Sequence, residues 1–198
     1  MTAVAIIDSG GANIASLRAA LARLGAESVV SSDHEVIRRA PRVLLPGVGS
    51  ANDAMSRLRI AGLDQLIPQL KQPLLGICLG MQLLYERSEE GQAHCLGVIP
   101  GAIGKLKAER GRPVPHMGWN QMTQVRPDPL MNGIGSLDHV YFVYSFSAPT
   151  SPATVAITDY GEAFTAVARR DNFCGTQFHP ERSGLVGSRI LANFLKAS

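Results

Sequence analysis

The chain has no long apolar run, no basic start and few cysteines. Its longest apolar stretch, from Leu74 to Tyr85, contains Gln82 and two glycines, whereas a membrane-spanning helix needs ~20 apolar residues. The first segment, Met1 to Asp8, carries no base and ends in an acid, so it predicts a strand rather than a signal peptide. Three cysteines cannot all pair with one another, which favours free thiols in a reducing cytoplasm.

Charge is also sparse. Charged residues make up 18% of the chain, and the formal net charge is +3. Apart from Arg38-Arg39 and Arg169-Arg170 the basic residues are scattered, and none forms a block interleaved with aromatics. We therefore expect a solvated surface, with neither a nucleic acid nor a membrane as partner.

No internal repeat, linker or low-complexity segment interrupts the sequence. Hydrophobic residues make up 45% of its 198 residues, which is an ordinary globular proportion. Because this length suits one sizeable core, we expect residues 1–198 to form a single domain.

Short apolar runs alternate with helical patterns in the first half of the chain. After Asn13, whose side chain can cap a helix, apolar residues recur at helical spacing. Such alternation predicts parallel strands joined by crossover helices. Strands are expected over residues 3–7, 28–31, 42–45 (ended by Pro46-Gly47) and 74–77, and helices over residues 14–24, 34–40, 51–58, 63–70 and 79–87.

The second half contains more strand-like runs and turn signals. Strands are expected over residues 114–119, 140–146, 153–158, 163–170 and 173–178, and a final amphipathic helix over residues 185–195. Asp171-Asn172 separates the last two strands and is a candidate two-residue hairpin turn. The predicted fold is a three-layer α/β domain: a mostly parallel central sheet flanked by helices, with added antiparallel strands in the C-terminal half.

Residues 76–80 carry the most informative pattern, Gly-x-Cys-x-Gly between a predicted strand and a predicted helix. The same arrangement with serine displays the nucleophile of α/β hydrolases, and its glycines remove Cβ atoms that would clash in so tight a turn. A helix N-terminus favours the thiolate of Cys78, and the free N–H of Leu79 can face an oxyanion. Cys78 is therefore the candidate nucleophile, whereas Cys95 and Cys174 are interpreted as small core hydrophobes.

A thiol nucleophile needs a base and a group that orients the base. His179 and Glu181 flank Pro180 just after the last predicted strand. In an extended backbone they would face the same side, so the carboxylate could accept the Nδ1 proton and leave Nε2 for the thiol. Alone this motif would indicate a surface turn, but an elbow about 100 residues upstream makes it the candidate partner of Cys78. No comparable neighbours flank the remaining histidines, His34, His94, His116 and His139.

Together these motifs resemble the triad-type (class I) glutamine amidotransferases, over nearly the whole chain. Four further segments look like the glutaminase subunits of imidazole glycerol phosphate synthases, which act in histidine biosynthesis: Pro46-Gly47-Val48-Gly49, Pro115-His116-Met117-Gly118-Trp119-Asn120, Tyr141-Phe142-Val143 and Glu181-Arg182-Ser183. Two segments depart from the family pattern. Residues 8–13 lack a usual tyrosine, and Tyr144-Ser145-Phe146 stands where the family carries His-Ser/Thr-Tyr.

The resemblance implies roles for individual residues. Cys78, His179 and Glu181 would form the catalytic triad. Leu79 would give one N–H to the oxyanion hole, and a flip of the peptide between Val48 and Gly49 would give the second, since glycine can change the sign of φ cheaply. Without the resemblance, this loop would be an ordinary Pro-Gly strand end.

A substrate pocket and a partner face are implied as well. The residues carried over to glutamine binding are Gly47, Gln82, Glu90, Ser145 and Phe146. Those carried over to the partner face are Asn13, Trp119 and Asn120. Simpler alternatives stay open for two of them: Glu90 as a solvated acid and Trp119 as a core residue.

The implied reaction is hydrolysis of glutamine to glutamate and ammonia through a thioester on Cys78. The ammonia would pass to a cyclase subunit, in a one-to-one heterodimer that makes imidazole glycerol phosphate and aminoimidazole carboxamide ribotide. We expect no metal or cofactor, and residues 10–13 match a phosphate loop only weakly. Three alternatives stay open: a cysteine peptidase or other α/β hydrolase, a non-catalytic interaction subunit, and an amidotransferase of another pathway.

Overall fold

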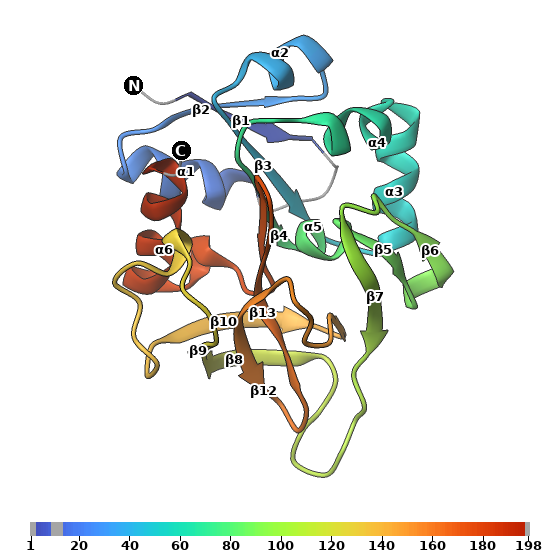
Figure 1. The fold of residues 1–198 in the computed structure, drawn as a ribbon, viewed down its shortest axis with the longest axis vertical. Coiled ribbons are helices and arrows are strands. Elements are labelled where there is room, and N and C mark those ends of the chain that lie inside the picture. Colours follow the sequence, from blue (N-terminus) through green and yellow to red (C-terminus); the bar gives the residue numbers. More distant parts are fainter. Residues whose placement is uncertain (1–2, 9–13, 197–198) are drawn as a thin grey trace.

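A computed structural model describes residues 3–8 and 14–196 of the chain. Its central sheet has eight strands in the order β2-β1-β3-β4-β14-β13-β12-β9 (Figure 1). Five of them pair in parallel: β1 (Ala3–Ile7), β2 (Glu27–Ser31), β3 (Arg42–Gly47), β4 (Leu74–Cys78) and β14 (Phe173–Thr176). The antiparallel extension consists of β13 (Ala163–Arg170), β12 (Thr154–Asp159) and β9 (Thr123–Gln124). The predicted fold class is confirmed.

Helices cover both faces of the parallel part of this sheet. On one face lie α1 (Ile14–Arg23) and α6 (Gly184–Lys196), and on the other α2 (His34–Arg39), α3 (Ala51–Ile60) and α4 (Leu63–Leu66) (Figure 1). Side chains of a strand alternate between the faces. Val4 and Ile6 accordingly join the apolar cluster under α1 and α6, whereas Ala5 and Ile7 join the cluster under α2 and α3. Two buried apolar layers, one on each face, therefore lie between the sheet and its helices.

Two smaller sheets complete the fold. One is an antiparallel pair of β8 (His116–Gln121) and β10 (His139–Tyr144), called here the β8–β10 ribbon. The other has the order β11-β7-β5-β6, formed by β11 (Phe146–Ser147), β7 (Ile99–Lys105), β5 (Tyr85–Ser88) and β6 (Ala93–His94). Short 3₁₀ turns are η1 (Ile67–Gln69), η2 (Glu90–Gln92), η3 (Pro129–Met131) and η4 (Pro180–Arg182).

The helix predicted over residues 79–87 is wrong in its second half. The observed helix, α5 (Leu79–Gln82), ends early and the chain enters β5 at Tyr85. Leu83, Leu84 and Tyr85 are all buried, and periodicity cannot distinguish a buried helix from a buried strand in so short an apolar run. The small sheet built from β5, β6 and β7 was therefore missed.

Strand β3 continues through the expected stop at Pro46-Gly47. Pro46 lies opposite Ile77 and Gly47 opposite Cys78 in the parallel pair β3–β4. A proline without an N–H is tolerated near the end of a strand, where few ladder bonds remain to be made. This extension brings Gly47 directly beside the candidate nucleophile.

The predicted Asp171-Asn172 hairpin is confirmed. Arg170 pairs with Phe173 across it, and Asp171 has a φ of 52°, as two-residue hairpin turns require. This hairpin returns the chain from β13 to β14, the strand that precedes His179. Within residues 3–8 and 14–196, no helix has the length and apolar character needed to cross a membrane.

Candidate active site

Cys78 lies at the junction of β4 and α5 with φ 54° and ψ −113°. This region of backbone space is unfavourable for a residue with a side chain. Two close approaches hold it there: a Cβ on Gly76 would lie 2.7 Å from the carbonyl oxygen of Gly80, and a Cβ on Gly80 would collide with the carbonyl oxygen of Leu45. The glycines on either side of the cysteine are therefore required by packing, as the sequence predicted.

His179 lies three residues past β14, at the start of the turn η4. Its Nδ1 is 2.9 Å from Oε1 of Glu181, and the carboxylate side chain is only 4% exposed. His179 itself is extended, with φ −96° and ψ 100°, but the expected extended backbone does not continue: Glu181 lies inside the 3₁₀ turn that begins at Pro180. The turn, rather than strand periodicity, brings the carboxylate to the ring.

The backbone around His179 is fixed by neighbouring groups. Its N–H donates to the carbonyl oxygen of Tyr141 at 3.0 Å. The hydroxyl of Ser183 donates to the carbonyl oxygen of His179 at 2.7 Å and accepts from the N–H of Tyr141 at 2.9 Å. The β8–β10 ribbon and η4 are thereby tied to each other at the imidazole.

The protonation of His179 follows from its neighbours. Burial disfavours the charged ring, but hydrogen bonds to Cys78 and Glu181, together with their negative charges, outweigh it and raise the pKa of His179 to about 10. The ring is therefore an imidazolium at neutral pH, positioned between sulfur and carboxylate. Such a group can donate a proton to a leaving amine and can later act as a base.

A cavity of about 420 Å³ opens over these groups. The predicted residues that line it are Gly47, Val48, Gly49, Cys78, Leu79, Gln82, Glu90, Ser145, Phe146 and His179. The structure thus brings together four distant stretches of sequence. Four lining residues had not been proposed as substrate contacts: Pro115, Val143, Tyr144 and Arg182. Each lies within or next to a segment that carried the family resemblance, which is the signal that could have found them.

Gln82 and Glu90 take different positions in the cavity wall. Nε2 of Gln82 donates to the carbonyl oxygen of Phe146 at 2.6 Å and to Oε1 of Gln177 at 2.9 Å, so this amide braces the wall from within. Glu90 is half-buried, and its Oε2 accepts from the N–H of Ala51 at 2.8 Å. It is therefore not a freely solvated acid.

The two proposed oxyanion donors lie on adjacent backbone segments. Leu79 is the first residue of α5, so its N–H has no acceptor within the helix. A Cβ on Gly47 would lie 2.8 Å from the nitrogen of Gly80, so the end of β3 packs against the start of this helix. Gly49 has a φ of 87°, and no atom lies within 4 Å of the position of a Cβ there. Backbone conformation, not space, requires this glycine.

The residues predicted for the partner face differ in exposure. Trp119 is 54% exposed and packs edge-on against Tyr141, with ring centroids 5.9 Å apart; the alternative of a core tryptophan is wrong. Asn120 is half-buried, and its Nδ2 donates to the carbonyl oxygen of Asp159 at 2.9 Å, so it holds the end of β12. Asn13 lies outside the described residues.

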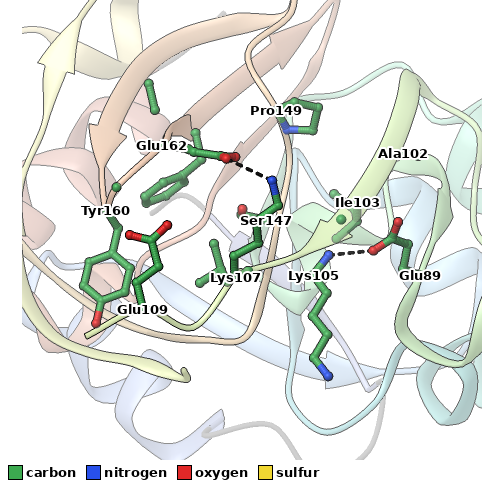
Figure 2. A pocket seen from close by; sticks show the side chains of 15 residues that line it. Glu89, Ala102, Ile103, Lys105, Lys107, Glu109, Ser147, Pro149, Tyr160 and Glu162 are labelled. Atoms are coloured by element: carbon green, nitrogen blue, oxygen red, sulfur yellow. Dashed lines mark hydrogen bonds and ion pairs between the residues drawn. The ribbon is translucent and has the colours of Figure 1, made fainter. Parts of the chain in front are cut away.

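A second cavity of about 250 Å³ lies between β7 and the turn that joins β12 to β13 (Figure 2). Its charged groups are largely used within the chain. Lys107 pairs with Glu162 at 3.2 Å, and Glu89 accepts from the backbone N–H of Lys105 at 2.8 Å. Neither the triad nor any predicted glutamine residue lines it. The cavity above Cys78 is therefore the candidate active site.

Comparison with known proteins agrees with this geometry. The family model described as glutamine amidotransferase class-I matches residues 5–197. The chain belongs to the class-I glutamine amidotransferase family. In this amidotransferase the Gly-x-Cys-x-Gly elbow and the histidine after β14 occupy one cavity, and their catalytic roles are taken up below.

Relatives of this amidotransferase match it from end to end. A protein of Xanthomonas campestris pv. campestris (strain 8004), named imidazole glycerol phosphate synthase subunit HisH, is 51% identical over 198 residues, which cover 100% of this chain and 99% of the relative. A protein of Xylella fastidiosa (strain Temecula1 / ATCC 700964) with the same name is 50% identical over 196 residues, covering 99% and 98% of the two chains.

Solved structures share the fold of this amidotransferase at low identity. A glutamine amidotransferase superposes with a TM-score of 0.74 at 18% identity, covering 98% of this chain and 97% of the other. PurLQS of Thermotoga maritima superposes with a TM-score of 0.72 at 19% identity, with the same coverage. These likenesses establish the three-layer architecture and its antiparallel extension, and nothing finer.

Proposed function

We propose that this chain is the glutaminase subunit of an imidazole glycerol phosphate synthase, acting in histidine biosynthesis. One observation carries the proposal: Cys78 and the His179–Glu181 pair meet at one cavity, in a chain 51% identical over its full length to a protein named as that synthase's subunit HisH. The substrate is glutamine, and the products are glutamate and ammonia.

The first half of the reaction forms a thioester. The thiolate of Cys78 attacks the side-chain amide carbon of glutamine, and the carbonyl oxygen becomes an oxyanion. As the tetrahedral intermediate collapses, the C–N bond breaks and the imidazolium of His179 donates its proton to the leaving nitrogen, which departs as ammonia. Glu181 holds the ring through Nδ1 at 2.9 Å, so that Nε2 faces the sulfur.

The second half releases glutamate. The neutral imidazole of His179 takes a proton from water, the resulting hydroxide adds to the thioester carbon, and the C–S bond breaks to restore the thiolate and the imidazolium. Both tetrahedral intermediates need donors at the same oxygen. The N–H of Leu79 supplies the first, and the peptide between Val48 and Gly49 supplies the second.

The second donor is the proposed control point. Because Gly49 tolerates a change in the sign of φ, the Val48–Gly49 peptide can turn its carbonyl or its N–H toward the oxyanion. We propose that the isolated subunit holds the carbonyl inward and that the loaded partner favours the N–H. Losing one oxyanion donor costs ~10²–10³-fold in rate, which is enough to prevent idle hydrolysis of glutamine.

The remaining pocket residues bind the substrate. Glu90 lines the cavity with one carboxylate oxygen bonded to the start of α3, and its negative charge suits the α-ammonium of glutamine. Gln82 braces the wall formed by Ser145 and Phe146, which places those residues along the aliphatic part of the substrate. Gly47 lines the cavity next to the elbow, opposite Cys78 in the β3–β4 pair.

The proposed partner is a cyclase subunit that receives ammonia in a one-to-one heterodimer. Trp119 is the exposed aromatic of the β8–β10 ribbon, and exposed tryptophans are frequent anchors of interfaces. Arg182 lies 4.8 Å above the ring of Tyr141 and also lines the active-site cavity, so this face adjoins the ammonia source. Asn13 and Asn120 complete the proposed face.

The proposal treats residues 1–198 as one domain that acts in the cytoplasm. Strands from both halves of the sequence share the central sheet, with β14 paired to β4, which supports a single cooperative unit. The three cysteines are free thiols, as a reducing compartment would keep them.

The deciding experiment measures glutamate release by the purified chain, alone and with the cyclase subunit and its nucleotide substrate. We expect slow hydrolysis alone and an increase of ~10²–10³-fold in the loaded complex. A glutamine-like diazo or chloroketone reagent should label Cys78, and no peptide should be cleaved. Equal rates in both states would exclude the gating proposal, and no hydrolysis in either state would exclude the function.

A further inference from the structure

Tyr144 lines the active-site cavity but has no role in the proposed reaction. Its ring is 5% exposed and lines the cavity with Cys78. Burial, together with the nearby negative charges that Tyr160 and Cys78 can carry, raises the pKa of its hydroxyl. Tyr144 is therefore a neutral phenol that needs a hydrogen-bond partner inside an apolar wall.

His116 is that partner. Its Nδ1 is 3.0 Å from the hydroxyl of Tyr144, and both side chains are buried. The imidazole is stacked between Tyr160, at 3.9 Å between centroids, and Phe142, at 5.3 Å. Because burial lowers the pKa of His116, the ring is neutral at pH 7, and with the proton on Nε2 its Nδ1 accepts from the phenol.

The pair lies at the end of the β8–β10 ribbon that contacts the catalytic groups. His116 and Tyr144 are directly opposite each other in the ribbon register. One residue earlier, the carbonyl oxygen of Val143 lies 3.7 Å from the sulfur of Cys78. Three residues earlier, the carbonyl oxygen of Tyr141 accepts from the N–H of His179 at 3.0 Å. Strand β10 therefore contacts both the sulfur of Cys78 and the backbone of His179.

We propose that the Tyr144–His116 hydrogen bond positions β10 for glutamine hydrolysis, so that Tyr144 and His116 are positioning residues for the Cys78–His179 pair. The inference rests on the proposed glutaminase function. Without this hydrogen bond, the facing side chains of His116 and Tyr144 are no longer joined at the end of the ribbon, and β10 can shift relative to the sulfur. A shift of about 1 Å in a catalytic geometry can cost 10²-fold in rate.

The test compares Tyr144→Phe with Tyr160→Phe. Both substitutions remove a phenol hydroxyl from a ring that contacts His116, but the hydroxyl of Tyr160 bonds to Pro113 outside the active-site cavity. We expect Y144F to lower kcat about tenfold, with KM changed by less than about threefold because the ring remains. We expect Y160F to leave both constants within about twofold of the native chain.

A second readout does not depend on glutamine. The rate at which iodoacetamide alkylates Cys78, followed by mass spectrometry of the peptide that contains it, reports how well the imidazolium supports the thiolate. We expect Y144F to slow this alkylation in parallel with kcat and Y160F to leave it unchanged. If the native chain fails to hydrolyse glutamine but Y144F still slows alkylation, the proposed function is wrong and the positioning inference stands.

Variants of His116 keep the inference falsifiable if Y144F does not fold. In His116→Asn the side-chain oxygen replaces Nδ1 as the acceptor for Tyr144, whereas His116→Phe keeps the stacked ring without an acceptor. We expect H116N to restore most of the alkylation rate that H116F loses. Alkylation and kcat that match the native chain in Y144F, or equal losses in H116N and H116F, would overturn the inference, since a purely structural pair would change only the melting temperature.

Discussion

The two sides of the active-site cavity are built by different means. On the nucleophile side, backbone meets backbone: Gly76 and Gly80 leave no room for a Cβ between β3, β4 and α5. On the opposite wall, side chains meet one another, with Tyr144 in ring contact with Phe142 and Phe164 and bonded to His116. The nucleophile side is therefore specified by the absence of side chains, and the wall by their identity.

This difference distinguishes a fixed turn that carries the candidate nucleophile from a wall that can move when its exposed face is bound. The elbow at Cys78 is packed against backbone at both Gly76 and Gly80, so a neighbouring side chain has no room to adjust it. A wall made of interlocking rings can move as a unit when one face of it is bound. The β8–β10 ribbon presents Met117 and Trp119 to solvent, and backbone carbonyl oxygens of its strand β10 contact Cys78 and His179. We therefore expect substitutions on the nucleophile side to change catalysis or folding stability, and substitutions on the exposed part of the wall to change partner binding.

The largest expected effect comes from removing the sulfur without disturbing the turn. Cys78→Ala should lower glutamine hydrolysis on the order of 10⁴-fold or more, since the proposed thioester forms on its sulfur. The variant should still unfold cooperatively in urea, with a free energy of unfolding changed only by the lost interaction of the sulfur with His179. Cys95→Ala is the matched control, because Cys95 lies away from the cavity, and it should keep full activity. Hydrolysis by C78A at more than a hundredth of the native rate would contradict the assignment.

The next effect tests the packing of the nucleophile side. Gly80→Ala places a Cβ against the carbonyl oxygen of Leu45, and we expect a loss of about 3–5 kcal/mol in the free energy of unfolding, because backbone cannot yield as a side chain does. Gly25→Ala is the control: its φ is 74° but nothing lies within 4 Å. That change should cost about 1–2 kcal/mol from backbone strain alone. Equal losses in urea titrations would refute the close-packing account.

The same contrast explains what could be predicted from the sequence. The elbow is a local pattern, so five residues sufficed to place Cys78, and the hairpin at Asp171-Asn172 was likewise local. The short sheet around β5 was missed because Leu83, Leu84 and Tyr85 are buried whichever element they form.

The wall could not be predicted for a different reason. His116 and Tyr144 are 28 residues apart and meet only because of the register of the β8–β10 ribbon, which a single sequence does not specify. His116 was accordingly given no role. The His179–Glu181 contact was predicted, but from an extended backbone that the structure replaces with a 3₁₀ turn. Side-chain assemblies that depend on register are thus the least predictable part of the site.

The pH dependence of stability tests how the two sides meet at His179. Its pKa is raised to about 10 in the folded chain by Cys78 and Glu181 in spite of burial, against about 6.5 when unfolded. Both states are protonated below pH 6.5, so the stabilisation is complete there and is lost as pH rises toward 10. Glu181→Gln removes one source of the raised pKa. We expect the total fall in unfolding free energy between pH 6 and 10 to be smaller in E181Q, because its curve levels off at the lower folded pKa, and an NMR titration of the ring to move downward; parallel curves up to pH 10 would contradict this.

The smallest expected effect on the fold is at the exposed end of the wall. Trp119→Ala should change the free energy of unfolding by less than about 0.5 kcal/mol, because the ring is 54% exposed and surface changes rarely cost more. Binding to the cyclase subunit should nevertheless weaken by about 2 kcal/mol or more if the ring anchors the interface. Val125→Ala is the control, since Val125 is 50% exposed but lies outside the ribbon. Titration calorimetry with the partner measures both affinities. If W119A and V125A bind the partner equally well, the interface lies elsewhere and does not include the strand that carries Trp119.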